Sequence, residues 1–242
     1  MIKINCDMGE RGSENPTDIE LMKYIHIANI ACGGHAGDKQ SVQVFRDLAK
    51  KNQVEVAGHL SYPDRENFGR VSISISMDRL KSSLDEQYSL IPDVKMIKFH
   101  GALYNDSWVN PELAETLLSW LMENEIKKVI VPFDSALAKL CASTSIKVIA
   151  EAFAERRYTF NEKTGQLSLV NRKYEYASIH DCEEAVEHAV SMVENQQVNA
   201  YLEDDSNGTH QQKIPICVET ICIHSDAVIS LDLAKRLSKQ FA

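Results

Sequence analysis

Short apolar runs alternate with longer segments of helical periodicity along the whole chain. Each run is short enough for one buried strand, and the segments between the runs space their apolar residues as a helix does. This alternation predicts repeated βα units and a largely parallel sheet. The pattern gives about seven such units, with strands predicted at residues 2–6, 27–31, 54–58, 96–99, 129–131, 148–151 and 218–223.

Local signals mark helix starts and loops between these units. Thr17 and Glu20 have the spacing of a capping box, and Asn110 followed by Pro111 is typical of a helix start. Residues 60–76 form a long polar loop after the third predicted strand, and residues 158–171 have the pattern of a hairpin. Residues 203–213 have no apolar period and are predicted to be a surface loop. Long loops in compact domains are often binding loops.

Composition and charge narrow the class of protein. The 242 residues contain no repeat, low-complexity tract or linker, so one domain spanning residues 1–242 is expected. A net charge of −9 argues against a nucleic-acid partner, which requires clustered Lys and Arg. No apolar window is long enough to cross a bilayer, and residues 1–7 do not resemble a signal peptide, so no membrane partner is expected. The six cysteines form no Cys-x-x-Cys pair, which favours a reducing, cytoplasmic compartment.

Polar residues gather where the predicted strands end. Asp7 closes the first strand, and four of the eight histidines lie at or just after strand ends, namely His35, His59, His100 and His224. The carboxyl ends of parallel strands meet at one edge of a sheet or one mouth of a barrel. Any one of these residues is more often structural than catalytic, but their predicted convergence favours a site. His26 and His188 are expected on helices away from it.

Strand alternation and glycine content add detail to this site. Side chains two residues apart share a strand face, so Asn5 is expected beside Asp7, and Lys98 beside His100. The stretch NIACGGHAGD, residues 29–38, has glycines that permit close approach of a ligand. Within it His35 supplies a titratable group, and Asp38 supplies an acceptor or a helix cap.

Five motifs, in this order and spacing, resemble the LamB/YcsF family: INCDMGE, NIACGGHAGD, GHLSYPDRENFGR, KFHGALYN and ICIHSD. The resemblance implies a (β/α) barrel of about seven parallel strands related to polysaccharide-deacetylase-like barrels. Characterised members belong to a prokaryotic ATP-dependent 5-oxoprolinase, which implies hydrolysis of the lactam amide of 5-oxo-L-proline to L-glutamate. ATP and two partner subunits are implied with it. The resemblance implies that the partners carry the ATP-dependent activation step, and the absence of a Gly-x-x-x-x-Gly-Lys-Ser/Thr phosphate loop from this sequence fits that division.

Motif matching carries site residues over to this chain. The expected catalytic residues are Asp7, His35, His59 and His100. The expected substrate-binding residues are Asn5, Glu10, Asp38, Arg70, Lys98, Tyr104, Asn105 and His224. Arg70 and Lys98 suit a carboxylate or phosphate. As a hypothesis, Asp7 with His35 or His59 activates water, while His100 and Lys98 bind the developing negative charge.

Some positions depart from the family pattern, and they leave other functions open. Arg157 and Ser225 stand where family members commonly have glycine, and Phe99 where they have proline. Larger residues there restrict the backbone and can fill substrate space, so another small amide is an alternative substrate. A divalent metal is possible, because the histidines and Asp7 could form the open site of a metal-dependent hydrolase or deacetylase. Further alternatives are a Cys32 nucleophile beside His35 and a non-catalytic subunit with a binding or regulatory role.

Overall fold

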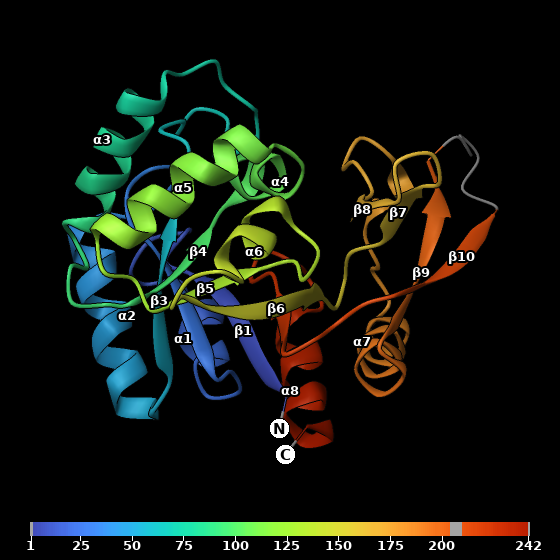
Figure 1. Ribbon diagram of the computed structural model, residues 1–242. Helices are drawn as coiled ribbons and strands as arrows, with labels where there is room; N and C mark the ends of the chain where they lie inside the picture. Colours follow the sequence, from blue (N-terminus) through green and yellow to red (C-terminus); the bar gives the residue numbers. More distant parts are fainter. Residues whose placement is uncertain (1, 204–209, 242) are drawn as a thin grey trace.

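Seven parallel strands close into a barrel in the computed structural model, which describes residues 2–203 and 210–241 (Figure 1). The strand order around the barrel is β1-β11-β6-β5-β4-β3-β2. The strands are β1 (Lys3–Met8), β2 (Ile27–Ala31), β3 (Glu55–Leu60), β4 (Met96–Phe99), β5 (Lys128–Val131), β6 (Lys147–Phe153) and β11 (Thr220–Ile223). Each predicted strand overlaps one of these, so the predicted (β/α) barrel is confirmed.

Helices pack around the outside of the barrel. They are α1 (Pro16–Leu21), α2 (Lys39–Asn52), α3 (Met77–Tyr88), α4 (Gly101–Val109), α5 (Pro111–Glu123), α6 (Ala136–Cys141) and α8 (Ser230–Gln240). In α2 the buried apolar residues Val42, Phe45 and Ala49 recur at helical spacing and face the strands. None of the described helices is long and apolar enough to cross a membrane.

The two helix starts predicted from sequence have different outcomes. Asn110 caps α5 by accepting the Leu113 N–H at 3.2 Å, with Pro111 as the first helical residue, so that prediction is confirmed. The capping box of Thr17 and Glu20 is wrong, because the residue that caps α1 lies two positions earlier. There Asn15 accepts the backbone N–H of Thr17 at 3.0 Å, and the side chain of Glu20 pairs with Lys23 instead.

A second sheet is inserted between β6 and β11 and lies beside the barrel (Figure 1). It has the order β10-β9-β7-β8 and comprises β7 (Tyr158–Asn161), β8 (Gln166–Leu169), β9 (Gln197–Leu202) and β10 (Gln211–Pro215), with α7 (Cys182–Asn195) between β8 and β9. The β7–β8 pair confirms the predicted hairpin. The predicted surface loop at 203–213 is wrong for residues 211–213, which pair with β9, while 204–209 lie outside the described residues.

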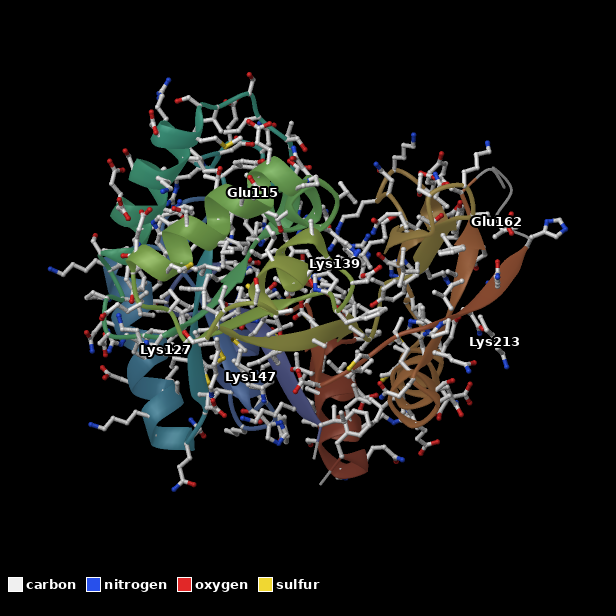
Figure 2. The ribbon with its side chains drawn as sticks, in the orientation of Figure 1. Glu115, Lys127, Lys139, Lys147, Glu162 and Lys213 are labelled. Atoms are coloured by element: carbon white, nitrogen blue, oxygen red, sulfur yellow. The ribbon has the colours of Figure 1, made fainter. Side chains whose placement is uncertain are left out.

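The barrel interior changes from apolar to polar along the strands. Ile27, Ala57, Met96, Ile130 and Ile149 form an apolar cluster of their own. Asn29, His59, Lys98 and Glu151 each lie two residues further along one of these strands and therefore share its inward face. These four are buried, whereas labelled charged side chains such as Glu115 and Lys127 lie on the surface (Figure 2). The polar layer therefore lies toward the carboxyl ends of the strands.

Candidate active site at the carboxyl end of the barrel

Asp7, His35, His59 and His100 meet at one mouth of the barrel. The His59 Nε2 atom lies 3.3 Å from Asp7 Oδ2 and 3.0 Å from His100 Nδ1. The imidazole of His35, from the loop after β2, stacks on that of His100 with ring centroids 3.6 Å apart. Their predicted convergence is therefore confirmed, although they come from four separate parts of the sequence.

A buried ion-pair network forms the floor of this site. Lys98 Nζ lies 3.1 Å from Asp7 Oδ1 and 2.9 Å from Glu151 Oε1. Burial would raise the pKa of Asp7, but the charges of His59 and Lys98 hold it well below its usual value. Burial would likewise lower the pKa of Lys98, but the nearby negative charge of Asp7 raises it well above its usual value. Both groups are charged at neutral pH, since each compensates the desolvation of the other.

Polar neighbours fix the orientation of this network. Asn29 Nδ2 donates to Asp7 Oδ1 at 2.8 Å and to Asn5 Oδ1 at 2.8 Å. Asn5 in turn donates to Thr220 at 3.0 Å. Tyr104 donates its hydroxyl proton to Glu151 at 2.7 Å. Asn5 and Tyr104, predicted as substrate-binding residues, thus have internal partners that hold the floor in place.

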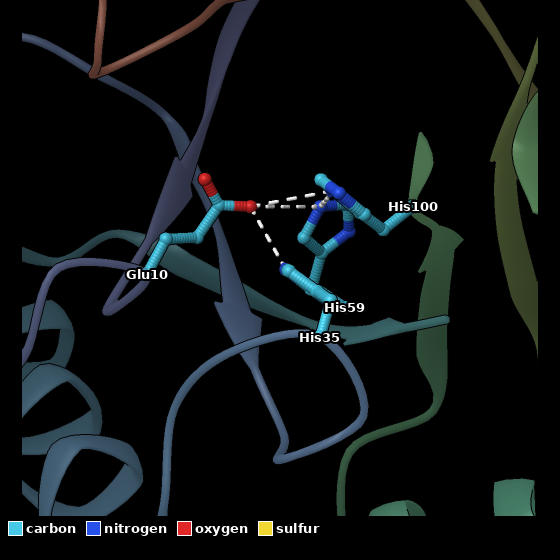
Figure 3. A group of neighbouring side chains, drawn as sticks. All are labelled: Glu10, His35, His59 and His100. Atoms are coloured by element: carbon cyan, nitrogen blue, oxygen red, sulfur yellow. Dashed lines mark hydrogen bonds and ion pairs between the residues drawn. The ribbon is translucent and has the colours of Figure 1, made fainter. Parts of the chain in front are cut away.

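Glu10 joins the three histidines through one carboxylate oxygen. Its Oε1 atom lies 2.9 Å from His35 Nε2, 3.3 Å from His100 Nδ1 and 3.7 Å from His59 Nε2 (Figure 3). Burial lowers the pKa of both His35 and His100 well below the usual value, and the charge of a neighbouring imidazole lowers each further. These two rings are therefore neutral at pH 7.

Glycines allow the loops to approach these histidines. Gly37 has φ +79°, and a Cβ there would lie 2.3 Å from the Ala31 carbonyl oxygen, so the loop can fold back on β2 only with glycine. Gly69 has φ +63°, and its Cβ would lie 2.9 Å from that of His35. Asp38 caps α2 by accepting the Ser41 N–H at 2.8 Å, so its contact is that of a helix cap.

A cavity of about 550 Å³ opens above this floor. Its walls include the predicted residues Arg70, Tyr104, Asn105 and His224. The inserted segment adds Arg156 and residues 168–172, which lie far in sequence from the early motifs. The cavity is therefore enclosed between the barrel mouth and the β7–β8 hairpin.

The cations around the cavity differ in how they are paired. Arg70 lies 3.0 Å from Asp226, and Arg156 donates to the carbonyl oxygen of Val170 at 2.8 Å. Burial lowers the pKa of Arg156 to about 10, which leaves it charged at neutral pH. Arg172 makes no hydrogen bond or ion pair with a described residue. Arg156 and Arg172 were missed from the sequence.

Two of the three positions that depart from the family pattern, Arg157 and Ser225, do not line the cavity. Arg157 pairs with Glu184 of α7, away from the cavity lining. Ser225 is buried, and its carbonyl oxygen accepts from Arg11 at 2.7 Å. Phe99 contributes to the lining but is fully buried at the end of β4. The expected filling of substrate space by Arg157 and Ser225 therefore does not occur.

Cys32 has the environment of an inert thiol. Its Sγ donates to the Ile30 carbonyl oxygen at 3.1 Å, and burial raises the pKa of Cys32 to about 12. A nucleophilic cysteine requires a thiolate near neutral pH. The geometry therefore does not favour the alternative in which Cys32 attacks the substrate beside His35.

Two groups of described side chains have the spacing to hold a metal ion. One comprises Glu10, His35, His59 and His100, and the other Asp7, Cys222 and His224. In the second group Lys98 Nζ lies 3.1 Å from Cys222 Sγ, so a cation already adjoins the sulfur.

His188 lies on α7 as predicted, but His26 is not helical. It precedes β2 and accepts the Ile4 N–H at 3.1 Å, at the opposite end of the barrel.

Fold and site together define a (β/α)-barrel protein with a buried carboxylate, lysine and histidine site at the carboxyl ends of its strands. The chain belongs to the LamB/YcsF family, whose sequence model matches residues 2–242. The predicted family is thereby confirmed.

Individual relatives match over nearly the whole chain. The chain is 31% identical to the A subunit of 5-oxoprolinase from Haemophilus influenzae, with 99% of this chain and 95% of that protein covered. It is 33% identical to the A subunit of 5-oxoprolinase from Clostridium beijerinckii, with 98% and 92% covered. The crystal structure of a lactam utilization protein from Thermus thermophilus has the same fold, with a TM-score of 0.82, 24% identity, and 99% and 96% of the two chains covered.

Proposed function

We propose that this chain is the A subunit of an ATP-dependent 5-oxoprolinase and hydrolyses the lactam amide of 5-oxo-L-proline to L-glutamate together with two partner subunits. Relatives that carry this name align with almost every residue of the chain. The observation that carries the proposal is the buried contact of Lys98 with Asp7, beside three histidines at the floor of a cavity. Charged groups buried at the floor of a cavity are typical of catalytic sites.

The chemistry suggests a division of labour between the subunits. A lactam amide resists hydrolysis, and phosphorylation of its oxygen makes the ring carbon electrophilic. Water adds to that carbon, and cleavage of the C–N bond with a proton delivered to the nitrogen opens the ring to an acyl phosphate. A second water molecule then releases phosphate and leaves glutamate. The chain has no phosphate loop of its own, so activation is assigned to the partners. This chain then has to bind the activated ring, place a water molecule and stabilise the charge that develops.

The contacts at the barrel mouth suggest how the water is placed. Asp7 Oδ2 lies 3.3 Å from His59 Nε2, so the two groups can orient a water molecule and receive its proton. His100 is a poor donor to the developing charge when neutral, because its Nε2 lies 3.0 Å from the Phe68 carbonyl oxygen and must donate there. That role passes to Lys98, which stays charged in the buried floor.

Arg172 is the best candidate for the carboxylate of the substrate. It lines the cavity and has no internal partner among the described residues, whereas Lys98 already contacts two carboxylates. A guanidinium group binds a carboxylate through two parallel hydrogen bonds. Arg70, predicted for this role, would have to share its charge with Asp226.

Reconstitution with the two partner subunits tests the proposal. We expect glutamate release from 5-oxoproline only when ATP, both partners and this chain are present together. Omitting each component in turn provides the controls. Equal release by the partners without this chain would show that it is non-catalytic, and no release with all components present would exclude 5-oxoproline as the substrate.

A further inference from the structure

When His59 and His100 are both neutral, two ring nitrogens without a proton face each other at the barrel mouth. His59 Nδ1 lies 3.2 Å from the Lys98 carbonyl oxygen, and His100 Nε2 lies 3.0 Å from that of Phe68. A carbonyl oxygen only accepts hydrogen bonds, so each of these nitrogens carries the proton of its ring. The remaining nitrogens, His59 Nε2 and His100 Nδ1, then present lone pairs to each other 3.0 Å apart. Two lone pairs repel at this distance unless a cation lies between or beside them.

Two more potential ligand atoms, Glu10 Oε1 and His35 Nε2, lie beside these ring nitrogens. Glu10 Oε1 lies 3.3 Å from His100 Nδ1 and 2.9 Å from His35 Nε2. Figure 3 shows the three imidazoles grouped around this one oxygen. All four donor atoms lie within 4.8 Å of one another. A shared proton would join only two of them, whereas a metal ion would satisfy all four.

We propose that Glu10, His35, His59 and His100 hold one divalent metal ion that prefers nitrogen ligands, such as Zn²⁺. Zinc–nitrogen and zinc–oxygen bonds near 2.0 Å put neighbouring ligands of a tetrahedral ion about 3.3 Å apart. The separations between the Glu10 oxygen and the three ring nitrogens, 2.9 Å, 3.3 Å and 3.7 Å, bracket that value. The His35 and His100 rings are stacked with their planes 2° apart, so one of the two must turn before both can aim a nitrogen at the same ion.

The surroundings of the histidines match those of metal ligands. A ligating histidine commonly donates its second N–H to a backbone carbonyl, which fixes the ring and its tautomer. His59 and His100 both have such a partner, on Lys98 and Phe68. Three imidazoles favour Zn²⁺ or Co²⁺ over Mg²⁺ and Ca²⁺, which prefer oxygen ligands.

The ion would adjoin the groups already assigned to the reaction. Asp7 Oδ2 lies 3.3 Å from His59 Nε2, so the ion would face the cavity beside Asp7. With His59 Nε2 bound to the ion, Asp7 is the group left to receive the proton of a water molecule there. A divalent ion in that position supplies Lewis acidity toward an amide oxygen. The inference concerns binding of the ion and does not depend on which amide is the substrate.

Metal binding by the full chain without an affinity tag tests the inference. After treatment with a chelator, equilibrium dialysis against Zn²⁺ should restore one ion per chain, and Co²⁺ should give visible d–d absorption bands. Zn²⁺ should also raise the melting temperature of the chelated protein, because the ion binds only the folded site. Neither Mg²⁺ nor Ca²⁺ should compete.

Three variants localise the ion. Glu10→Gln and His100→Asn should each weaken Zn²⁺ binding at least tenfold and remove the Co²⁺ bands. His26→Gln is the matched control, since this histidine lies at the opposite end of the barrel and should bind as the parent does. Glu10 follows β1 outside any helix or strand, so its variant should fold even if His100→Asn does not.

Two results would overturn the inference. If the unsubstituted protein binds no Zn²⁺, a shared proton alone lies between His59 Nε2 and His100 Nδ1. If Glu10→Gln binds Zn²⁺ as tightly as the parent, the ion lies elsewhere. Neither result would affect glutamate release in the reconstituted complex, so failure of this inference is distinguishable from failure of the proposed function.

Discussion

Lys98 is the residue on which the floor of the site depends. It is almost fully buried, and its ammonium group contacts the carboxylates of Asp7 and Glu151. Burying such charges is costly unless each has a partner, so removing Lys98 would leave two buried carboxylates without compensation. The geometry of the floor is thus maintained by the same charges that are proposed to act on the substrate.

Asp7→Asn keeps the shape of this side chain but removes its charge. We expect turnover in the reconstituted complex to fall by about a hundredfold or more, the usual range for losing a positioned acid–base group. The fold should persist, because the Asn can still accept from Asn29 and Lys98 retains Glu151. Steady-state rates and circular dichroism check both expectations. Asp47→Asn, on the exposed face of α2, is the matched control. Near-normal turnover of Asp7→Asn would make Asp7 structural.

Arg172→Met tests the carboxylate-binding role separately from chemistry. A hydrogen bond to a charged group contributes roughly 1.5–3 kcal/mol, so the KM for 5-oxoproline should rise at least about tenfold. The kcat should change little, because the contact is the same in the ground state and the transition state. With 2-pyrrolidinone, which lacks the carboxylate, parent and variant should behave alike. Lys173→Met serves as the neighbouring control. An unchanged KM would place the substrate carboxylate elsewhere.

At the scale of elements, the sequence predicts the barrel well and the inserted sheet poorly. Buried parallel strands are nearly continuous apolar runs, and all five residues of β2 are buried. In β10 only Ile214 is buried, while Gln211, Gln212 and Lys213 are exposed, so no apolar period marks the strand. Strand ends also predicted the histidine cluster. Arg172 gave no such signal, because it reaches the cavity only through the folding of the insertion over the barrel.

The inserted element α7 contains a histidine that should make stability depend on pH. The ring of His188 is partly buried between α7 and β7, and its Nε2 has no hydrogen-bond partner among the described residues. Burial lowers the pKa of His188 to about 4, and the charge of Arg157 lowers it further, although Glu184 and Glu155 oppose this. In the unfolded chain the imidazole titrates near its ordinary pKa of about 6.5.

The sign of the effect follows from proton binding. Below about pH 6.5 the unfolded chain takes up a proton that the folded chain excludes, so stability is complete above that pH and is lost as the pH falls toward 4. The loss from His188 should reach up to about 3 kcal/mol. Melting temperatures between pH 7 and pH 4.5 should fall less in His188→Gln than in the parent. His180→Gln, at an exposed position, is the control. Equal slopes in parent and His188→Gln would contradict the assignment.

For the whole molecule, the site combines two parts of the fold. The barrel supplies the floor, and the insertion between β6 and β11 supplies Arg156 and residues 168–172 of the cavity wall. Asp7, His59 and Lys98 of the floor come from barrel strands, whereas Arg172 of the wall comes from the insertion. Substrate choice is therefore expected to depend on the insertion, and bond cleavage on the barrel.

The isolated chain should hydrolyse neither ATP nor 5-oxoproline at an appreciable rate. Its cavity holds groups suited to water activation and charge stabilisation, but the sequence has no phosphate loop with which to activate an inert lactam. Phosphate release and glutamate formation by the folded chain alone, verified by its melting transition, provide the measurement. Adding ATP and both partner subunits to the same sample should start turnover, which shows that the isolated chain was competent. ATP-dependent glutamate formation before that addition would mean that this chain carries out the activation step itself, and the proposed division of labour would have to be abandoned.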